Sequence, residues 1–264
     1  MAFLSYEYRM KISYEEEISK CYYTIKSIPA DDYRQKGMSY EISIAPPVRY
    51  AEGMDSFGNR QIYGCENIPH DVFEYGIKGM VETKEGNHCD RISENRLGMY
   101  KYPYGKCVPG EKILAFAKEI ECDVVNMETT EEKCRCLMEK LSKKLTYEKG
   151  CTGVDTSAEE AFGLGKGVCQ DFAHIYICLL KIFGIPARYV CGLIVGEGES
   201  HAWVEAACDG FFIGVDPTYN KEIDENYIKL GVGRDAMDCT INRGVMWGGG
   251  KQQQEISVLV ERLY

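Results

Sequence analysis

The first part of the chain alternates between apolar and polar residues with a period of two. Within residues 6–14 every second residue is apolar or aromatic, and Glu7, Arg9 and Lys11 lie between them. Successive side chains of a strand point to opposite faces, so this pattern predicts a half-buried strand. The alternation recurs at 38–44 and 73–81. Residues 1–84 are therefore predicted to form a small antiparallel β-domain.

Helical periodicity replaces this alternation beyond residue 110. Residues 85–109 are rich in Gly, Asn and Pro with little periodicity, so they are predicted to form a linker. Apolar residues three or four apart then follow at 113–120 and 134–145, which is typical of amphipathic helices. Thr129 and Glu132 form a capping-box pattern ahead of the second stripe.

A longer helix is predicted from Val168 to Phe183. Gly184 ends it, and Pro186 prevents it from resuming. Strands are predicted after this helix, at 188–195, 201–207, 211–216 and 256–262. A helix packed on an antiparallel sheet makes residues 110–264 an α+β domain.

Composition limits the possible partners and surroundings of the chain. It has 264 residues, with 31 Lys and Arg against 41 Asp and Glu, and its net charge of -10 argues against nucleic acid as a partner. No apolar run is long enough for a membrane span, and residues 1–10 lack the apolar stretch of a secretory leader. The 13 cysteines are an odd number in a long chain. These features predict a cytoplasmic protein with reduced thiols.

Cys169 differs from the other cysteines in its setting. It follows the glycine-rich segment 163–167 and lies at the start of the predicted helix. A helix N-terminus carries about half a positive charge, which favours the reactive thiolate. Its free main-chain N–H groups are also suited to hold an oxyanion. Most free cysteines are small buried residues, but this setting makes Cys169 the candidate nucleophile.

A hairpin register points to a second part of the site. Residues 209–210, Asp-Gly, form a strong two-residue turn signal between two apolar runs. Such a turn pairs Cys208 with Phe211 and sets Trp203 opposite Asp216. Trp203 itself is interpreted as packing beside the site.

His201 lies two residues from Trp203, so it shares a face with Asp216 as its diagonal neighbour. A carboxylate beside a histidine fixes the imidazole tautomer and leaves the other ring nitrogen free for the thiol proton. Packing of the Cys169 helix against this face would complete a triad. In isolation, Asp216 before Pro217 is also compatible with a plain turn.

The remaining histidines and a cysteine pair are interpreted as structural. His174 lies five residues after the candidate nucleophile and points to another side of the helix, which favours helix packing. His70 and His88 are assigned surface roles. Cys134 and Cys136 are two residues apart on a helix and face different sides, so no metal site or cofactor is expected.

The candidate residues lie in longer segments with a recognisable order. These read Gly-Val-Cys-Gln-Asp-Phe-Ala-His at 167–174, Gly-Ile-Pro-Ala-Arg-Tyr-Val at 184–190, His-Ala-Trp-Val-Glu at 201–205 and Val-Asp-Pro-Thr at 215–218. Together they resemble the microbial branch of the transglutaminase-like superfamily, a papain-like cysteine fold. The resemblance covers about 110–264, and residues 1–84 are similar to the β-rich domain that often precedes it.

The resemblance implies that Cys169, His201 and Asp216 are the nucleophile, the base and the orienting group, with a thioester intermediate. By analogy, Tyr147 lines the cleft. Eukaryotic crosslinking transglutaminases carry Trp immediately after the nucleophile, whereas this chain has Gln170. The difference favours a thiol-dependent hydrolase of peptide or protein amide bonds. An acyltransferase with an amine acceptor and a non-catalytic peptide-binding module are the alternatives, and the oligomeric state is open.

Overall fold

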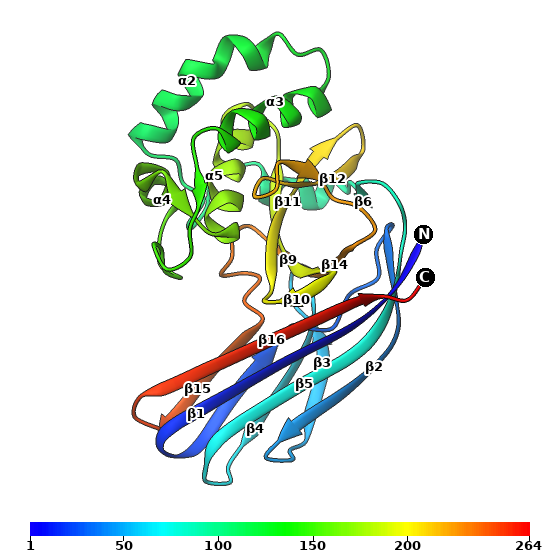
Figure 1. Ribbon diagram of the computed structural model, residues 1–264, viewed down its shortest axis with the longest axis vertical. Coiled ribbons are helices and arrows are strands. Elements are labelled where there is room, and N and C mark those ends of the chain that lie inside the picture. The colour runs from blue at the N-terminus through cyan, green and yellow to red at the C-terminus, as the bar shows by residue number, and fades with distance from the viewer.

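The computed structural model describes all 264 residues as two antiparallel sheets and a group of helices. Figure 1 shows the helices at one end of the molecule, an eight-stranded sheet at the other end and a six-stranded sheet between them. This arrangement confirms the predicted α+β fold class with a β-rich N-terminal region. No helix has both the length and the apolar character needed to cross a membrane.

The eight-stranded sheet is organised around one long strand, β1. Its members are β1 (Ala2–Ile25), β2 (Gln35–Ala45), β3 (Tyr50–Met54), β4 (Arg60–Glu66), β5 (His70–Thr83), β10 (Gly196–Gly198), β15 (Asn242–Gly248) and β16 (Gln252–Arg262). The first half of β1 pairs with β5 and β16, and its second half pairs with β4 and β15. Tyr6, Tyr8 and Met10 are buried, as the alternating pattern predicts.

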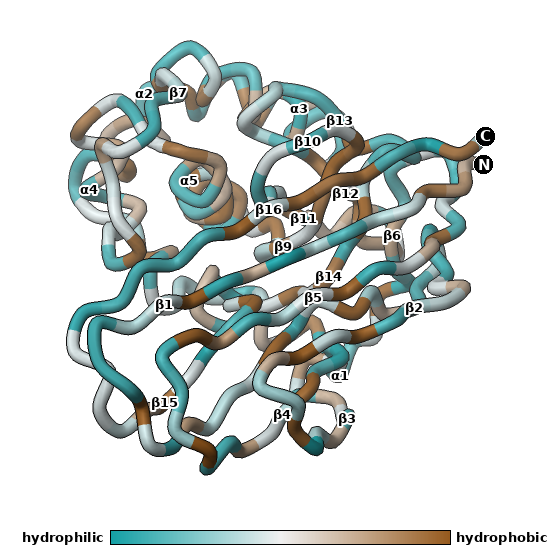
Figure 2. Tube along the Cα trace, turned by 60° about the horizontal axis from the view of Figure 1, so that its bottom comes forward, coloured by the Kyte–Doolittle hydropathy of each residue, from teal (hydrophilic) through white to brown (hydrophobic).

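Hydropathy changes along the strands of this sheet. Figure 2 shows β16 turning from teal over its glutamines to brown over residues 256–260. Val258 and Val260 are buried there, whereas Leu259 between them is 40% exposed. The apolar half of β16 therefore has one face toward the core and one toward solvent.

The sheets divide the chain differently from the predicted boundaries. β15 and β16 lie within the predicted 110–264 unit, yet both pair with β1 in the eight-stranded sheet. The predicted linker 85–109 contains β6 (His88–Arg91), α1 (Glu94–Leu97) and the 3-10 helix η1 (Gly98–Tyr100), and β6 pairs with β12 of the other sheet. Periodicity predicts that a segment is a strand but not which distant strand it joins.

The six-stranded sheet lies at the centre of the molecule. It contains β6, β9 (Ala187–Ile194), β11 (His201–Cys208), β12 (Phe211–Asp216), β13 (Lys221–Glu222) and β14 (Tyr227–Gly233). The order is β13-β12-β11-β9-β14, with β6 also beside β12, so β14 forms one edge. All residues of β14 are buried, which shows that this edge is covered by other parts of the chain.

Four helices pack together beside this sheet. They are α2 (Glu111–Val125), α3 (Thr130–Ser142), α4 (Ala158–Leu164) and α5 (Cys169–Ile182), and the short strands β7 (Thr146–Tyr147) and β8 (Lys166–Gly167) pair in parallel among them. The predicted capping box is present, because the Thr129 hydroxyl accepts the Glu132 N–H and the Glu132 carboxylate accepts the Thr129 N–H. Gly184 follows α5 with φ +75°, which suits the predicted stop.

Candidate active site

Cys169 is the first residue of α5, and the start of this helix is held by a buried carboxylate. One oxygen of Asp171, Oδ2, accepts the N–H of Val168 at 2.8 Å and the hydroxyl of Thr152 at 2.6 Å. Asp171 lies in the first turn, where negative charge is favoured by the helix dipole. These bonds fix the turn in which the half-buried Cys169 thiol lies.

The loop that contributes Thr152 also brings Tyr147 to the site. Tyr147 is the parallel partner of Gly167, and the N–H of Glu148 donates to the Gly167 carbonyl at 2.9 Å. Burial raises the pKa of Tyr147, and the neighbouring Cys169 raises it further. Tyr147 therefore lies near the thiol, as the family resemblance implies.

His201 and Asp216 are hydrogen-bonded to each other. The distance from His201 Nε2 to Asp216 Oδ2 is 2.7 Å. The hairpin that carries them pairs Cys208 with Phe211 and Val204 with Val215, which confirms the register predicted from the turn. Because Asp216 occupies Nε2, the nitrogen left for the thiol is Nδ1.

Asp216 is fully buried and accepts four hydrogen bonds. Besides His201, the Tyr227 hydroxyl donates to Oδ2 at 2.8 Å. The main-chain N–H groups of Thr218 and Tyr219 donate to Oδ1 at 2.9 and 3.3 Å. A buried carboxylate needs such partners in place of the water that it has lost, and these four bonds fix its orientation beside the imidazole.

The charge state of His201 follows from these neighbours. Burial lowers the pKa of His201, but its interactions with Asp216 and Cys169 outweigh burial and raise the pKa from 6.5 to about 9. The imidazole is therefore protonated at neutral pH. An imidazolium beside a cysteine at a helix N-terminus is the environment that stabilises a thiolate.

The structure corrects the expected packing of α5 against the histidine face of the hairpin. The buried apolar residues of α5 belong to one core with Ala202 and Val204, whereas Trp203 packs in a separate cluster with Val190 and Tyr227. Successive residues of a strand face opposite sides, so α5 covers the face opposite Trp203. Cys169 and His201 nevertheless interact, and each is the first residue of its element.

Two aromatic rings stack with the His201 imidazole. Trp203 lies 6.4 Å away at 25° between ring planes, and Tyr219 lies 5.4 Å away at 27°. Trp203 is fully buried, which agrees with the predicted packing role, and Tyr219 is 61% exposed. Together they restrict the imidazole plane, while the Tyr219 side faces solvent.

The other histidines lie apart from this site. His174 is buried, its Nε2 accepts the N–H of Ala236 at 3.1 Å, and burial lowers its pKa to about 3, so it is a neutral packing residue. The surface role expected for His70 is wrong, because His70 is buried and packs edge-on against Tyr14. His88 is exposed and packs edge-on against Phe211.

Cys134 and Cys136 have different surroundings. The Cys134 Sγ lies 3.9 Å from the Cys208 Sγ in the core, and Cys136 is half-buried. The two thiols of this pair thus have separate structural environments. Neither contacts His201 or Asp216 in the hydrogen-bonded site described above.

Sequence reasoning missed Tyr227 and the two main-chain donors to Asp216. The signal for the donors was present, because Asp before Pro-Thr-Tyr is a pattern in which a carboxylate accepts N–H groups two and three residues later. Tyr227 lies on a different strand, β14, and no spacing rule relates it to Asp216.

Comparison with protein families divides the chain into two matched regions. Residues 115–217 match the transglutaminase-like superfamily core. Residues 4–82 match the bacterial transglutaminase-like N-terminal region. The first match contains Cys169, His201 and Asp216, and the second contains most of β1 and β5.

Related sequences occur in bacteria. An uncharacterized protein of Mycobacterium leprae is 42% identical over 130 residues, and this match covers 46% of each chain, so less than half of that relative's length is spanned. An uncharacterized protein of Mycobacterium tuberculosis is 25% identical over 270 residues, which covers 91% of this chain and 86% of that protein. A protein-glutamine gamma-glutamyltransferase of Pseudomonas aeruginosa is 32% identical over 87 residues, which covers 28% of this chain and 13% of that enzyme.

The fold is shared with a solved structure along the whole chain. A proposed cysteine protease from Cytophaga hutchinsonii superimposes with a TM-score of 0.81 at 20% identity, covering 100% of this chain and 92% of that one. With both family matches in order along the chain, the protein contains a transglutaminase-like core and a bacterial transglutaminase-like N-terminal region.

Proposed function

We propose that the protein is a thiol-dependent hydrolase of amide bonds in peptides or proteins, with Cys169, His201 and Asp216 as its triad. One observation carries this proposal. The buried Asp216 holds His201 at 2.7 Å, and His201 in turn interacts with a thiol at a helix N-terminus. Covalent acyl transfer requires a nucleophile, a base beside it and a carboxylate that orients the base, and the three residues are suited to these roles in that order.

In the first half-reaction the Cys169 thiolate attacks the amide carbonyl carbon. The carbonyl oxygen takes the negative charge, and main-chain N–H groups in the first turn of α5 are suited to stabilise it. When the tetrahedral intermediate collapses, the C–N bond breaks and the His201 imidazolium gives its proton to the leaving amine. The products of this step are the free amine and a thioester on Cys169.

In the second half-reaction water releases the acyl group. The neutral His201 now accepts a proton from water as the oxygen attacks the thioester carbon. The C–S bond then breaks, and the carboxylic acid leaves with Cys169 again paired with imidazolium. Asp216 takes part in no proton transfer, and its role is to orient the ring and stabilise its charged form.

Transfer to an amine is the second candidate function. It follows the same first half-reaction, with an amine in place of water in the second. The relative from Pseudomonas aeruginosa, named as a gamma-glutamyltransferase, supports it over the matched 87 residues. Gln170 in place of Trp favours water as the acceptor, so hydrolysis is our first choice.

We also propose that the protein works in a reducing compartment such as the cytoplasm. All 13 cysteines are free thiols, and a reactive thiolate is the form most easily oxidised. With a net charge of -10, the substrate we propose is a peptide or protein rather than nucleic acid.

The function is tested by incubating the protein with a peptide library, with and without a primary amine, and measuring the product masses by mass spectrometry. Hydrolysis converts an amide to an acid, whereas transfer replaces the amine that leaves with the added amine and changes the mass by the difference between the two. Cys169→Ala is the control and should yield neither product. A peptide-binding module would bind library members without changing their mass in either protein, and that result would overturn the enzymatic proposal.

A further inference from the structure

Tyr227 contacts the same carboxylate oxygen as the catalytic imidazole. Its hydroxyl lies 2.8 Å from Asp216 Oδ2, and His201 Nε2 lies 2.7 Å from that oxygen. Tyr227 and Asp216 are both completely buried, so water does not substitute for either contact. Two donors on one oxygen, with the main-chain donors on the other, leave the carboxylate a single orientation.

The Tyr227 ring is itself fixed by packing. It meets Trp203 edge-on, with ring centroids 5.4 Å apart and planes at 82°. Trp203 also stacks with the His201 imidazole. The hydroxyl of Tyr227 therefore holds Asp216, and its ring supports Trp203, which lies against the imidazole.

From this geometry we infer that Tyr227 is a positioning residue that holds His201 in place through Asp216. The inference rests on the proposed function, because it assigns a role within the same triad. Tyr227 contacts neither the thiol nor the acyl carbon in the mechanism above. Its effect is on the direction and the charge of the carboxylate that orients the base.

The strand that carries Tyr227 is held by the N-terminal region. β14 is an edge strand, and its outward N–H and C=O groups bond to side-chain amides in place of another strand. Gln35 donates to the Lys229 carbonyl and accepts the Lys229 N–H, both at 2.8 Å. Asn59 does the same at Val232, at 2.8 and 2.7 Å. Each amide thus makes the two hydrogen bonds that a paired strand residue makes.

Arg34 fixes the start of β14 at Tyr227 itself. Its guanidinium donates to the Tyr227 carbonyl at 2.5 Å and to the Asp224 carbonyl at 2.9 Å. Arg34 and Gln35 are almost fully buried, and both belong to the region that matches the bacterial transglutaminase-like N-terminal region. The N-terminal region is therefore connected to His201 through Tyr227 and Asp216, by contacts of about 3 Å or less at each step.

The test uses Tyr227→Phe, which keeps the ring and removes only the hydroxyl. The matched control is Tyr176→Phe, because Tyr176 is equally buried and its hydroxyl donates to the Cys134 carbonyl at 2.8 Å rather than to Asp216. Both variants lose one buried hydrogen bond. Only the first changes the surroundings of the triad carboxylate.

Two readouts separate positioning from general stability. The first is the midpoint pH of the His201 imidazole titration, followed by the NMR chemical shifts of its ring protons. The second is the rate at which iodoacetamide alkylates Cys169 as a function of pH. Tyr227→Phe should displace the midpoint and slow alkylation about tenfold or more, as expected for a lost hydrogen bond to a charged group. Tyr176→Phe should leave both unchanged.

A second variant tests the N-terminal connection without touching the triad. Gln35→Met removes both amide bonds to Lys229 at similar side-chain length, and it should displace the His201 midpoint in the same direction by a smaller amount. The inference is overturned if Tyr227→Phe titrates like the wild type, or if Tyr176→Phe shifts the midpoint equally. Failure of the proposed function is a separate result, since the NMR midpoint reports positioning even in a protein without turnover.

Discussion

Charged side chains are exposed on one sheet of the molecule and buried in the other. On the outer face of the eight-stranded sheet, Lys11 and Glu74 form an ion pair at 3.7 Å with their side chains 46% and 53% exposed. In the six-stranded sheet, Glu205 has no exposed side-chain surface and pairs with two cations. Solvent screens the exposed pair and weakens its attraction, whereas the buried pairs are screened much less.

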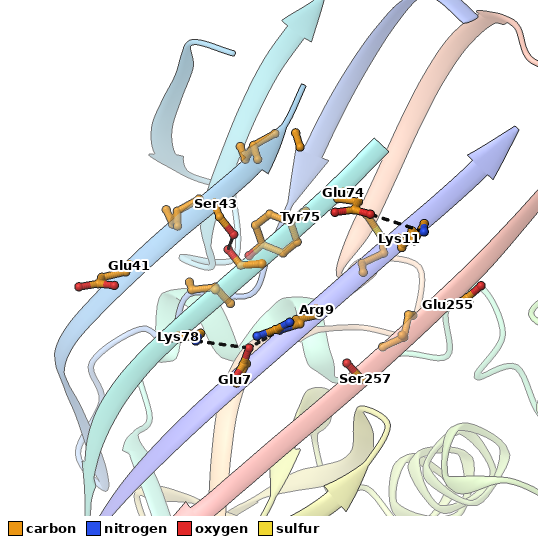
Figure 3. A pocket seen from close by; sticks show the side chains of 17 residues that line it. Glu7, Arg9, Lys11, Glu41, Ser43, Glu74, Tyr75, Lys78, Glu255 and Ser257 are labelled. Carbon is orange, nitrogen blue, oxygen red and sulfur yellow. Dashed lines mark hydrogen bonds and ion pairs between the residues drawn. The ribbon is translucent and has the colours of Figure 1, made fainter. Parts of the chain in front are cut away.

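The outer face of the large sheet forms a hollow of about 720 Å³ lined by charged, polar and apolar residues. Figure 3 shows the pairs of Lys11 with Glu74, and of Arg9 and Lys78 with Glu7, along neighbouring strands. No lining residue belongs to α5, β11 or β12. We interpret this hollow as a solvated sheet surface.

The central sheet instead contains a closed network of buried charges. Arg188 Nε lies 2.7 Å from Glu205 Oε2, and Lys229 Nζ lies 3.0 Å from Glu205 Oε1 and 2.6 Å from Asp32 Oδ2. Asp216 is the other buried carboxylate of this sheet, and it bonds to His201. Charged residues therefore have a fixed geometry where they are buried and partnered, and the candidate site lies in that part of the fold.

The largest change in stability is expected from removing the buried carboxylate of Glu205. Glu205→Ala removes the one fully buried carboxylate that Arg188 and Lys229 share. The two cations then keep the partly exposed Asp90, and Lys229 also keeps its pair with a second aspartate of the network. The free energy of unfolding should fall by about 3 kcal/mol. Urea denaturation measures this change. If Glu205→Ala is as stable as the wild type, the buried network is not the stabilising element described above.

Acid should act through the same carboxylate. Burial raises the pKa of Glu205, but Arg188 and Lys229 outweigh burial and lower it from 4.5 to about 2. A depressed folded-state pKa gives stability that is present above the unfolded pKa and is lost as pH falls from about 4.5 toward 2. Glu205→Gln should lose this part of the pH dependence. Equal slopes for both proteins in urea titrations across that window would contradict the assignment.

In the proposed mechanism, the raised pKa of His201 should set the alkaline limit of activity. His201 must be protonated to give a proton to the leaving amine, so amide turnover should fall as pH rises through about 9. Asp216→Asn removes the charge that supports the imidazolium and should move this limit to lower pH. A pH profile of kcat/KM measures the shift. An unchanged alkaline limit in Asp216→Asn would show that Asp216 does not support the charged form of His201.

The smallest effect is expected on the exposed sheet. Lys11→Gln breaks the pair with Glu74 and should change the free energy of unfolding by at most about 0.5 kcal/mol. The change should shrink further at high salt, because exposed charges are screened. A loss comparable to that of Glu205→Ala, measured in the same urea titration, would remove the contrast between the two sheets.

The local parts of the candidate site could be predicted from the sequence. The start of α5 at Cys169 followed from glycines and apolar spacing, and the Asp-Gly turn predicted the register that sets His201 beside Asp216. Both depend on neighbouring residues, for which backbone geometry allows few alternatives.

The parts that were missed depend on contacts between distant segments. β15 and β16 join β1 from the other end of the chain, and Gln35 completes the edge of β14 across 194 residues. The face of the hairpin that α5 covers was also missed, because alternation gives two faces without saying which one a helix takes. Tertiary pairing, rather than local propensity, decides all three.

Competitive alkylation measures whether His201 and Asp216 activate Cys169. The chain provides its own reference, because Cys122 is an exposed thiol outside the site. At about pH 6 an ordinary thiol with a pKa near 8.5 is almost entirely protonated, so iodoacetamide should label Cys169 on the order of a hundredfold faster than Cys122. His201→Ala should abolish this preference. Equal labelling of Cys169 and Cys122 in the wild type, or a preference that survives His201→Ala, would contradict the account.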